Sequence, residues 1–476
     1  MNHKFQNLTG QVISAKSGNR YTVAEIAGNG SQGVVYKEIS GKHMIKLYYP
    51  SDLPHIGKDI IEKLSFVQNV KKPKNFVKIH DLIEKPYIGY IMDRVTEHKS
   101  LNSYLIPDSN KSFADWYNSG HGFRGRLIIG YIIAKAFRML SADNLSYCDI
   151  SGNNILVKVN SREASVRMID IDNIYIAGRG NTSVLGTPRY IAPEIISRAK
   201  NPDLFSDNYS LAVLLFELLR IGHPYVSDEI LDGTPEDEET AYAGKAEYVT
   251  DTNSSNMLPS DIAFTGKLKE LFERCFVAGK INRMERPSAK DFEFAFLEAS
   301  NKIIKCPSCG AWHYPRKIER KYLPCPWCNG ESEPKAYLNF IDRLYSEIDK
   351  NSKSLPQKLS EKLVTSYILR EGKNQIKSFY VLRADFDYAE TDVYSANYVT
   401  IVKVGNEYHL YNEFDKEGIC VKPCNTEKFQ TLGQKGDIVL NSGDEIYFGV
   451  CNKKATKISC EGKSFNFIRI AKFATR

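Results

Sequence analysis

A carboxylate and a carboxamide lie five residues apart in the segment from Tyr147 to Val157. Asp149 opens a polar loop, Asn154 closes it, and an apolar run typical of a strand begins directly afterwards. A carboxylate can orient and deprotonate a hydroxyl, and an amide oxygen can bind a divalent cation. The spacing therefore predicts one loop that holds a general base and a metal ligand ahead of a strand.

A glycine-rich loop and a lysine precede this segment. Gly28, Gly30 and Gly33 leave a loop whose backbone N–H groups can cradle phosphates, although an ordinary hairpin turn has the same pattern. Lys46 follows inside an apolar strand, where an ammonium needs an anionic partner. An amphipathic helix over 59–69 offers the carboxylate of Glu62, with that of Asp59 as a rival. Two separate surface charges are the alternative.

A second acidic segment follows the loop. The strand Val166–Ile169 ends in Asp170, and Asp172 comes two residues later. Either carboxylate can bind a divalent cation, in the register of Asp170 or in the alternative register of Asp172.

The ordered motifs resemble those of the eukaryotic-like protein kinase superfamily over roughly residues 20–300. The segment from Gly186 to Glu194 is similar to the GTPxYxAPE pattern of the serine/threonine members. The resemblance implies an α+β, bilobal kinase-like fold with an N-lobe over 1–95 and a C-lobe over 96–300. It also implies ATP and Mg²⁺ as ligands and transfer of the γ-phosphoryl group to hydroxyls of protein substrates.

The same resemblance assigns roles to single residues. The catalytic set is Asp149 as the base, with Lys46 and its partner Glu62, and the Mg²⁺ ligands are Asn154 and Asp170. The implied nucleotide-binding residues are Gly28, Gly30, Gly33, Val35, Lys46, Met92, Asp93, Val95, Asn154 and Asp170. Three structural roles follow too: Thr187 bonds near Asp149, Glu194 pairs with Arg286, and Asp207 braces the catalytic loop.

Several positions depart from the family pattern. Tyr147 and Cys148 replace the usual histidine and arginine, Ser151 replaces a lysine, and Asp172 replaces the DFG glycine. None of these changes removes the lysine, base and metal ligands that phosphoryl transfer needs. An ATP-binding pseudokinase scaffold is the alternative function. Thr182 and Ser183 are candidate autophosphorylation sites. The alternative is that they are ordinary polar residues of a loop.

Four cysteines form two CxxC pairs separated by fifteen residues: Cys306, Cys309, Cys325 and Cys328. This spacing predicts a structural Zn²⁺ ribbon over 301–330, since so short a segment has little core of its own. Redox chemistry is the alternative and would not need both pairs. His313 is expected to be exposed rather than a ligand. The other cysteines lack such spacing, and Cys420 and Cys424 are predicted to be free thiols.

The last part of the chain reads as two segments. Residues 331–374 are charged and predict a helix plus linker, most flexible over 351–357, and residues 375–476 predict a small all-β domain. The segment from Ile438 to Gly449 resembles the end of forkhead-associated β-sandwiches, which bind phosphothreonine. The serine and histidine used for that binding are not recognisable, so a protein-docking module is the plainer interpretation.

The catalytic-loop variant and the cysteine pairs together resemble a narrower group, the bacterial kinases of tellurium-resistance (TerY) clusters. That group implies two partners, a von Willebrand factor A protein and a metal-dependent phosphatase, in a stress response. The net charge of +7, from 64 basic and 57 acidic residues, does not indicate a nucleic-acid partner. No signal peptide or membrane span is recognisable, which predicts a cytoplasmic protein.

Overall fold

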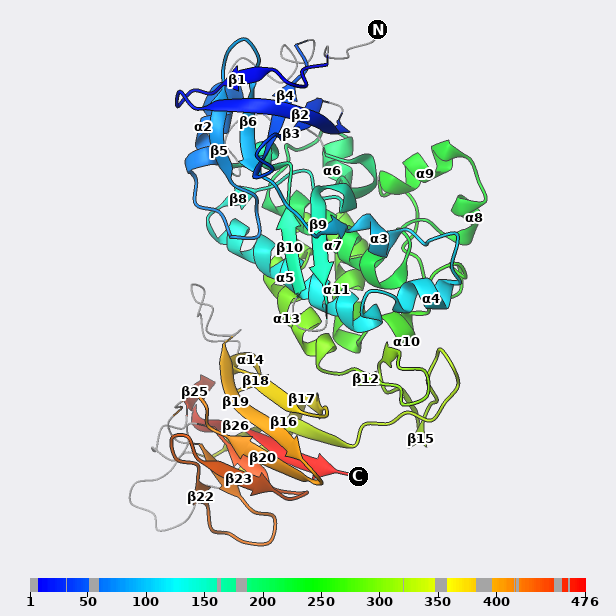
Figure 1. The fold of residues 1–476 in the computed structure, drawn as a ribbon. Coiled ribbons are helices and arrows are strands. Elements are labelled where there is room, and N and C mark those ends of the chain that lie inside the picture. Colours follow the sequence, from blue (N-terminus) through cyan, green and yellow to red (C-terminus); the bar gives the residue numbers. More distant parts are fainter. Residues whose placement is uncertain are drawn as a thin grey trace. The chain divides into compact units, whose positions relative to one another are not determined.

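The computed structural model describes residues 7–30, 32–50, 60–160, 164–176, 186–319, 321–346, 358–381, 396–414, 416, 419–448, 456–460 and 463–476. Asp59, Thr182, Ser183 and the linker over 351–357 lie outside these ranges. The chain divides into two compact units, Met1–Ala299 and Ser300–Arg476 (Figure 1). None of the described helices is long and apolar enough to cross a membrane.

The first unit begins with a six-stranded antiparallel sheet in the order β1-β2-β3-β4-β6-β5. Its strands are β1 Val12–Ser14, β2 Arg20–Asn29, β3 Gly33–Glu38, β4 His43–Tyr48, β5 Ile79–Ile83 and β6 Gly89–Asp93. Alternate apolar residues such as Tyr36, Ile45 and Ile91 form its core. Helix α2, Ile60–Asn69, packs against β5.

The rest of this unit is mainly helical, which positions the catalytic loop (Figure 1). Its long helices are α5 Gly122–Ala142, α7 Leu204–Arg220 and α13 Ala289–Ser300. Shorter helices are α3 Asn102–Leu105, α4 Phe113–Asn118, α6 Pro193–Ile196, α8 Asp228–Leu231, α9 Pro235–Tyr242, α10 Ser260–Ala263, α11 Gly266–Glu273 and α12 Gly279–Ile281. Single turns are η1 Gly152–Asn154, η2 Ile171–Asn173, η3 Pro188–Tyr190, η4 Arg274–Ala278 and η5 Arg283–Glu285. Helix α7 is apolar and buried along most of its length and packs against α5. Both helices contact β8 (Leu145–Ser146), the strand that leads into the catalytic loop.

Short antiparallel strands present the loop and the acidic segment side by side. Strand β9 (Ile155–Val159) pairs with β10 (Ala164–Met168) and with β7 (Lys99–Ser100). Strand β8 (Leu145–Ser146) pairs with β11 (Tyr175–Ile176). Because β9 follows the loop and β10 precedes η2, the pairing brings Asn154 and Asp170 to the same end of one hairpin.

The second unit contains two antiparallel sheets that share one apolar core. One sheet has the order β17-β16-β26-β24-β21-β22, with β25 paired to β26, and the other has the order β18-β19-β20-β23. Their bounds are β16 Ala336–Tyr345, β17 Lys358–Leu369, β18 Lys373–Lys377, β19 Asn397–Val404, β20 Glu407–Tyr411, β21 Cys420–Lys422, β22 Gln430–Thr431, β23 Asp437–Leu440, β24 Glu445–Tyr447, β25 Thr456–Cys460 and β26 Lys463–Thr475. One short helix, α14 Ser378–Val381, directly follows β18. Phe340, Ile401 and Phe473 lie in the shared core, so the sheets pack face to face as a sandwich.

The prediction of a helix within residues 331–374 is wrong for the described part of this segment, whereas the linker predicted over 351–357 lies outside the described residues. This segment forms β16 and β17, which pair with each other, and β16 also pairs with β26 at the other end of the domain. In β16, Ala336, Leu338 and Phe340 point into the core at strand spacing, while the intervening positions are less buried. The charged residues favour a helix locally, but pairing with a strand more than a hundred residues away overrides that preference.

Candidate active site and cysteine cluster

A cavity of about 990 Å³ lies between the N-terminal sheet and the helical part of the first unit. All ten residues assigned above to nucleotide binding line it. The glycine loop between β2 and β3 contributes one wall, and Met92, Asp93 and Val95 contribute another. Asp149, Asn154 and Asp170 face the same space. The structure therefore brings residues from distant parts of the chain into one nucleotide-sized cleft.

Asp149 and Asn154, the predicted base and metal ligand, hold each other in place. Asn154 Nδ2 donates to Asp149 Oδ2 and to the Asp149 carbonyl oxygen, each at 2.9 Å. Thr187 Oγ1 donates to the other carboxylate oxygen, Asp149 Oδ1, at 2.8 Å, as predicted. The carboxylate thus has a fixed orientation toward the cleft, which a general base requires.

A buried aspartate fixes the loop from behind. Asp207, near the start of α7, accepts hydrogen bonds from the backbone N–H groups of Tyr147 and Cys148 and from the Ser146 hydroxyl, at 2.7, 3.0 and 2.9 Å. Its predicted bracing role is confirmed. These bonds hold Cys148 at φ +67°, a backbone conformation that is costly outside glycine and occurs often at functional sites.

Lys46 lies at the centre of a buried charge cluster. Its Nζ donates to Asp170 and, at 2.9 Å, to Asp172 Oδ2. Burial disfavours the ammonium, but the two carboxylates outweigh this effect and raise the pKa of Lys46 well above its usual value. Burial and the charge of Asp172 raise the pKa of Asp170 to about 6. Burial also disfavours the Asp172 anion, yet Lys46 and the Tyr48 hydroxyl lower its pKa.

The two aspartates face different surroundings, which bears on the choice of metal ligand. The Asp170 side chain is 31% exposed and lines the cleft, whereas that of Asp172 is 2% exposed and lies behind Lys46. Asp170 has φ +59°, and this strained backbone turns its carboxylate toward the cleft. The geometry favours the register in which Asp170, together with Asn154, holds the cation.

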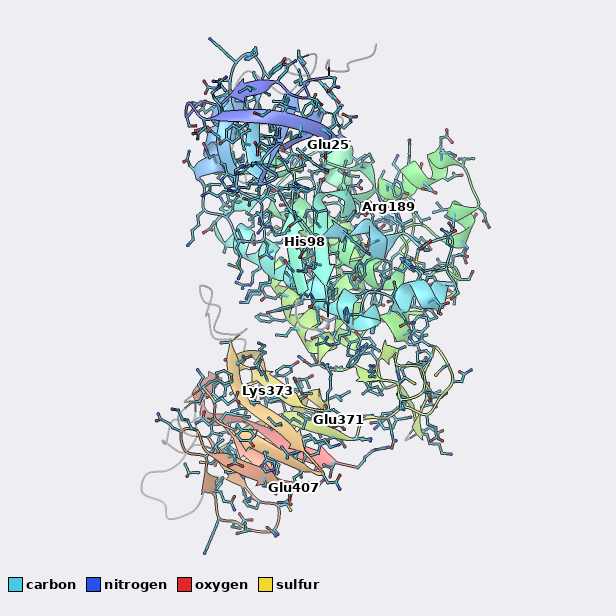
Figure 2. The ribbon with its side chains drawn as sticks, viewed as in Figure 1. Glu25, His98, Arg189, Glu371, Lys373 and Glu407 are labelled. Carbon is cyan, nitrogen blue, oxygen red and sulfur yellow. The ribbon has the colours of Figure 1, made fainter. Side chains whose placement is uncertain are left out.

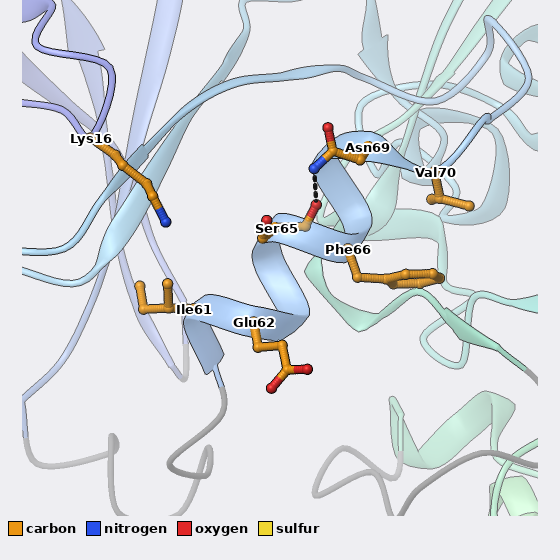
Figure 3. Close-up of a pocket in the computed structure, with 7 residues that line it drawn as sticks. All are labelled: Lys16, Ile61, Glu62, Ser65, Phe66, Asn69 and Val70. Carbon is orange, nitrogen blue, oxygen red and sulfur yellow. Dashed lines mark hydrogen bonds between the residues drawn. The ribbon is translucent and has the colours of Figure 1, made fainter.

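Glu62 lies away from the cleft. It is an exposed residue of α2 and lines an open surface hollow with Lys16, Ser65 and Phe66 (Figure 3). Among the described residues, the ion-pair partners of Lys46 are Asp170 and Asp172. The structure therefore does not bring Glu62 to Lys46, because helix rotation of about 100° per residue turns it to the outer face of α2.

Sequence reasoning missed two neighbours of Lys46. Tyr48 was not considered, although it follows Lys46 by two residues on one strand and therefore shares its face of the sheet. Its hydroxyl donates to Asp172 Oδ2. Asp172 was considered as a metal ligand only. Asp172 follows Asp170 by two residues, just as Tyr48 follows Lys46. This spacing was the signal that a second carboxylate was available to Lys46.

A second cavity, of about 530 Å³, adjoins the first on the helical side. The two share Asn153 and Thr187, which flank Asp149. Arg189, labelled in Figure 2, lines the second cavity, where it donates to Glu217 and, at 2.8 Å, to the Tyr242 hydroxyl. A base at the junction of two cavities can act on a group that enters from either side.

The predicted ion pair below this region is confirmed. Arg286 donates two hydrogen bonds to Glu194, at 2.6 and 2.8 Å. The arginine side chain is 1% exposed. Because a bidentate guanidinium–carboxylate pair fixes both groups in a plane, it ties the segment after the cleft to the last part of the domain.

The four cysteines of the two CxxC pairs converge in the second unit. Two short hairpins carry this region, β12 Ile304–Lys305 with β13 Trp312–His313 and β14 Lys317–Ile318 with β15 Lys321–Tyr322. The Sγ atoms of the four cysteines all lie within 4.8 Å of one another. The Sγ–Sγ distances are 3.6 Å for Cys306–Cys328 and 3.8 Å for Cys309–Cys325. Tetrahedral Zn²⁺ with bonds of about 2.3 Å requires sulfurs about 3.8 Å apart. The donor set therefore fits a structural zinc ion with four thiolate ligands.

Two cysteine-region predictions need correction. His313 is buried, not exposed: its ring nitrogens lie 2.9 Å from Ser332 Oγ and 2.8 Å from the Tyr314 carbonyl oxygen. It remains outside the four-cysteine cluster, as expected. Cys424 is a free thiol as predicted, but Cys420 is disulfide-bonded. Its spacing from Cys424 gave no sign of that bond.

Comparison with known proteins agrees with this geometry. A family model described as a protein kinase domain matches residues 21–294. The chain is 25% identical to serine/threonine-protein kinase dkf-2 of Caenorhabditis briggsae, over 46% of this chain and 18% of that protein. It is 24% identical to myosin light chain kinase A of Dictyostelium discoideum, over 48% of this chain and 76% of that protein. For serine/threonine-protein kinase DCLK3 of Mus musculus the identity is 25%, over 46% of this chain and 27% of that protein.

Each of these similarities covers under half of this chain, and for two of the three relatives it spans under a third of the other protein. The family model covers more than half of the chain and includes every residue of the catalytic loop and the acidic segment. The chain therefore belongs to the protein kinase domain family, with a serine/threonine kinase domain over residues 21–294.

Proposed function

We propose that this protein is an active serine/threonine kinase that transfers the γ-phosphoryl group of ATP to hydroxyls of other proteins. The observation that carries the proposal is the convergence of Asp149, Asn154, Asp170 and Lys46 on one cleft with the glycine loop. These are the parts that phosphoryl transfer uses, namely a base, metal ligands, a phosphate-binding ammonium and backbone donors.

Each residue has a role in that reaction. Asp149 orients the acceptor hydroxyl and takes its proton as the oxygen bonds to the γ-phosphorus and the bond to the bridging β–γ oxygen breaks. Lys46 and the N–H groups of the glycine loop hold the phosphates. Asn154 and Asp170 would hold Mg²⁺, which neutralises charge on the β- and γ-phosphate oxygens when bound. The backbone of residues 93–95 would meet the adenine.

The second cavity supplies a route for the acceptor. It adjoins the nucleotide cleft at Asn153 and Thr187, next to the bonded pair Thr187–Asp149. An extended protein segment lying there would bring a serine or threonine hydroxyl to the base. We therefore assign the larger cavity to the nucleotide and the smaller one to the acceptor.

One observation favours a second function, an ATP-binding scaffold without transfer. Ser151 stands where serine/threonine kinases usually carry a lysine, and it is buried, with no hydrogen-bond partner for its Oγ among the described residues. It therefore supplies no charge to the transferring phosphoryl group. Binding of ATP and Mg²⁺ without incorporation of phosphate would favour this scaffold.

The deciding experiment compares phosphate incorporation from labelled ATP in the wild type and three variants. Lys46→Ala and Asp149→Ala should each abolish labelling, while circular dichroism shows a folded chain. Lys267→Ala removes an exposed lysine that pairs with Glu270 outside the cleft, and it should label like the wild type. Equal labelling in all variants would refute the assignment of the site.

The finer identity rests on resemblance. The catalytic-loop variant and the four-cysteine cluster after the kinase domain support membership of the tellurium-resistance group, with a von Willebrand factor A protein and a metal-dependent phosphatase as partners in a stress response. Two sheets packed face to face support a forkhead-associated fold for the C-terminal domain. Free thiols at Cys148, Cys275 and Cys424, outside the four-cysteine cluster, support a cytoplasmic location, whereas the disulfide bond of Cys420 does not. Co-purification of the two partners with the tagged full chain tests this group identity.

A further inference from the structure

One short segment, over residues 170–173, supplies both carboxylates that hold Lys46. Asp170 directly precedes η2 and Asp172 lies within it, and both accept from the Lys46 ammonium. Asp170 lines the cleft and is available to a cation, whereas Asp172 is buried behind the lysine. If a cation occupies Asp170, Lys46 still keeps Asp172 as its partner.

Helix α2 offers no carboxylate to this cluster. Its acidic residue, Glu62, lies on the outer face, in the hollow drawn in Figure 3. The next residue, Lys63, is a cation that interacts electrostatically with Asp172, Lys46 and Asp170, and burial lowers its pKa. The helix therefore presents a positive charge where protein kinases usually present a glutamate to the phosphate-binding lysine.

The surroundings of Asp172 suit a permanent anion. Tyr48 donates to the same carboxylate oxygen as Lys46, and both side chains are buried. The other oxygen, Asp172 Oδ1, is buried without a hydrogen-bond partner among the described residues. A buried carboxylate that is only partly satisfied is costly, so its retention calls for attractive charges nearby, and Lys46 and Lys63 provide them.

We propose that Asp172 is the positioning residue for Lys46, and that it replaces the helix glutamate of other protein kinases. The orientation of Lys46 is then set by the turn that also carries the metal ligand Asp170, and not by the position of α2. Movement of that helix, which controls the lysine–glutamate pair in other kinases, would leave Lys46 in place here. This inference rests on the proposed kinase function.

The test measures binding of ATP with Mg²⁺ to the full chain by titration calorimetry, which reports the dissociation constant and the folded fraction separately. Asp172→Asn keeps the side-chain shape and removes the charge. We expect it to weaken ATP binding about tenfold or more, with unchanged stoichiometry, because Lys46 loses one charge-assisted bond. Glu62→Gln, the competing assignment, should bind within about twofold of the wild type.

A double variant that moves the carboxylate from position 172 to helix α2 provides a rescue test. Asp172→Gly restores the residue type usual in the family and should weaken binding like Asp172→Asn. Adding Lys63→Glu to it returns a carboxylate to α2 on the side facing Lys46, and we expect most of the affinity to recover. If Asp172→Asn does not fold, Tyr48→Phe removes only the hydroxyl that supports Asp172 and should weaken binding about threefold.

The outcomes separate this inference from the proposed function. A wild-type chain that binds ATP but transfers no phosphate contradicts the function alone. Asp172→Asn with wild-type affinity overturns the inference alone, and so does a lower stoichiometry with an unchanged dissociation constant, which indicates a structural role only. A loss of affinity in Glu62→Gln as large as that in Asp172→Asn also overturns it.

Discussion

The side-chain nitrogen of Asn154 donates two hydrogen bonds to Asp149, each at 2.9 Å. One goes to the carboxylate and the other to the main-chain carbonyl oxygen. Both acceptors lack hydrogens, so the amide nitrogen must face Asp149. The amide oxygen of Asn154 then points away from Asp149. Because Asn154 lines the cleft, this oxygen can act as an acceptor there. One side chain thereby orients the base and presents an oxygen to a cation.

Asn154→Asp should remove the donor that orients Asp149 while keeping the shape of the side chain and an oxygen for the cation. It replaces the donor by a second carboxylate beside Asp149, and loss of a hydrogen bond to a charged group alone costs about 1.5–3 kcal/mol. We expect the rate of phosphate incorporation to fall about tenfold to a hundredfold or more. Asn144→Asp, an exposed change at the turn after α5, is the control and should leave the rate unchanged.

Mg²⁺ binding should weaken at acidic pH through Asp170. Its pKa is raised to about 6, so in the free protein the carboxylate is mostly protonated below that pH and ionised above it. A cation that needs the ionised form must displace the proton at low pH. The apparent Mg²⁺ affinity should therefore be level above pH 7 and fall about tenfold per unit well below pH 6. Titration of phosphate incorporation with Mg²⁺ from pH 5 to 8 measures it, and a flat profile would contradict the prediction.

The cleft could be predicted from the sequence because its parts are local patterns. The glycine loop, the strand lysine and the Asp149–Asn154 loop each combine a residue type with a fixed spacing, and all of them line one cavity. The bonds of Asp207 to the loop and of Arg286 to Glu194 join distant parts of the chain, and they were anticipated only through the resemblance to protein kinases.

The partner of Lys46 and the strands over residues 336–369 depend on contacts that no local pattern contains. Glu62 was chosen for its spacing, but it is exposed on α2, while the partly buried Lys63 is the residue of this helix whose charge interacts with the aspartates. Strand β16 obtains its partner β26 from the far end of the domain. The zinc-type cluster needed only the spacing of its cysteines, because a metal ion accepts ligands wherever the loops can bring them.

Removing the buried ion pair below the cleft should destabilise the kinase domain. Arg286→Ala leaves Glu194, whose side chain is 15% exposed, without the partner that makes two bonds to it. Breaking one side of a buried pair costs about 3–5 kcal/mol. Chemical denaturation of the full chain measures the loss, and Lys267→Ala, in an exposed pair with Glu270, should cost under about 1 kcal/mol. Equal effects would mean that the pair contributes little.

The glycines of the phosphate loop should differ in their effect on stability. A Cβ atom at Gly33 would lie 2.2 Å from the Leu47 carbonyl oxygen, so the adjacent strand would have to move. A Cβ atom at Gly28 meets nothing within 4 Å. Gly33→Ala should therefore lower the melting temperature by several degrees, equivalent to about 1–3 kcal/mol, while Gly28→Ala should not. A shift of the same size for both variants would contradict this packing argument.

Zinc should be required for the stability of the second unit. The four sulfurs fit a tetrahedral ion, and Cys325 is fully buried among them. Freshly purified protein should contain one Zn²⁺ per chain by elemental analysis, and Cys325→Ser should lose it and unfold at a lower temperature, because metal binding contributes folding free energy to so small a core. Cys424→Ser, an exposed free thiol outside the cluster, is the matched control and should keep both the metal and the melting temperature. A metal-free chain whose four cysteines are joined as two disulfides, with unchanged stability, would instead establish the cluster as a redox pair.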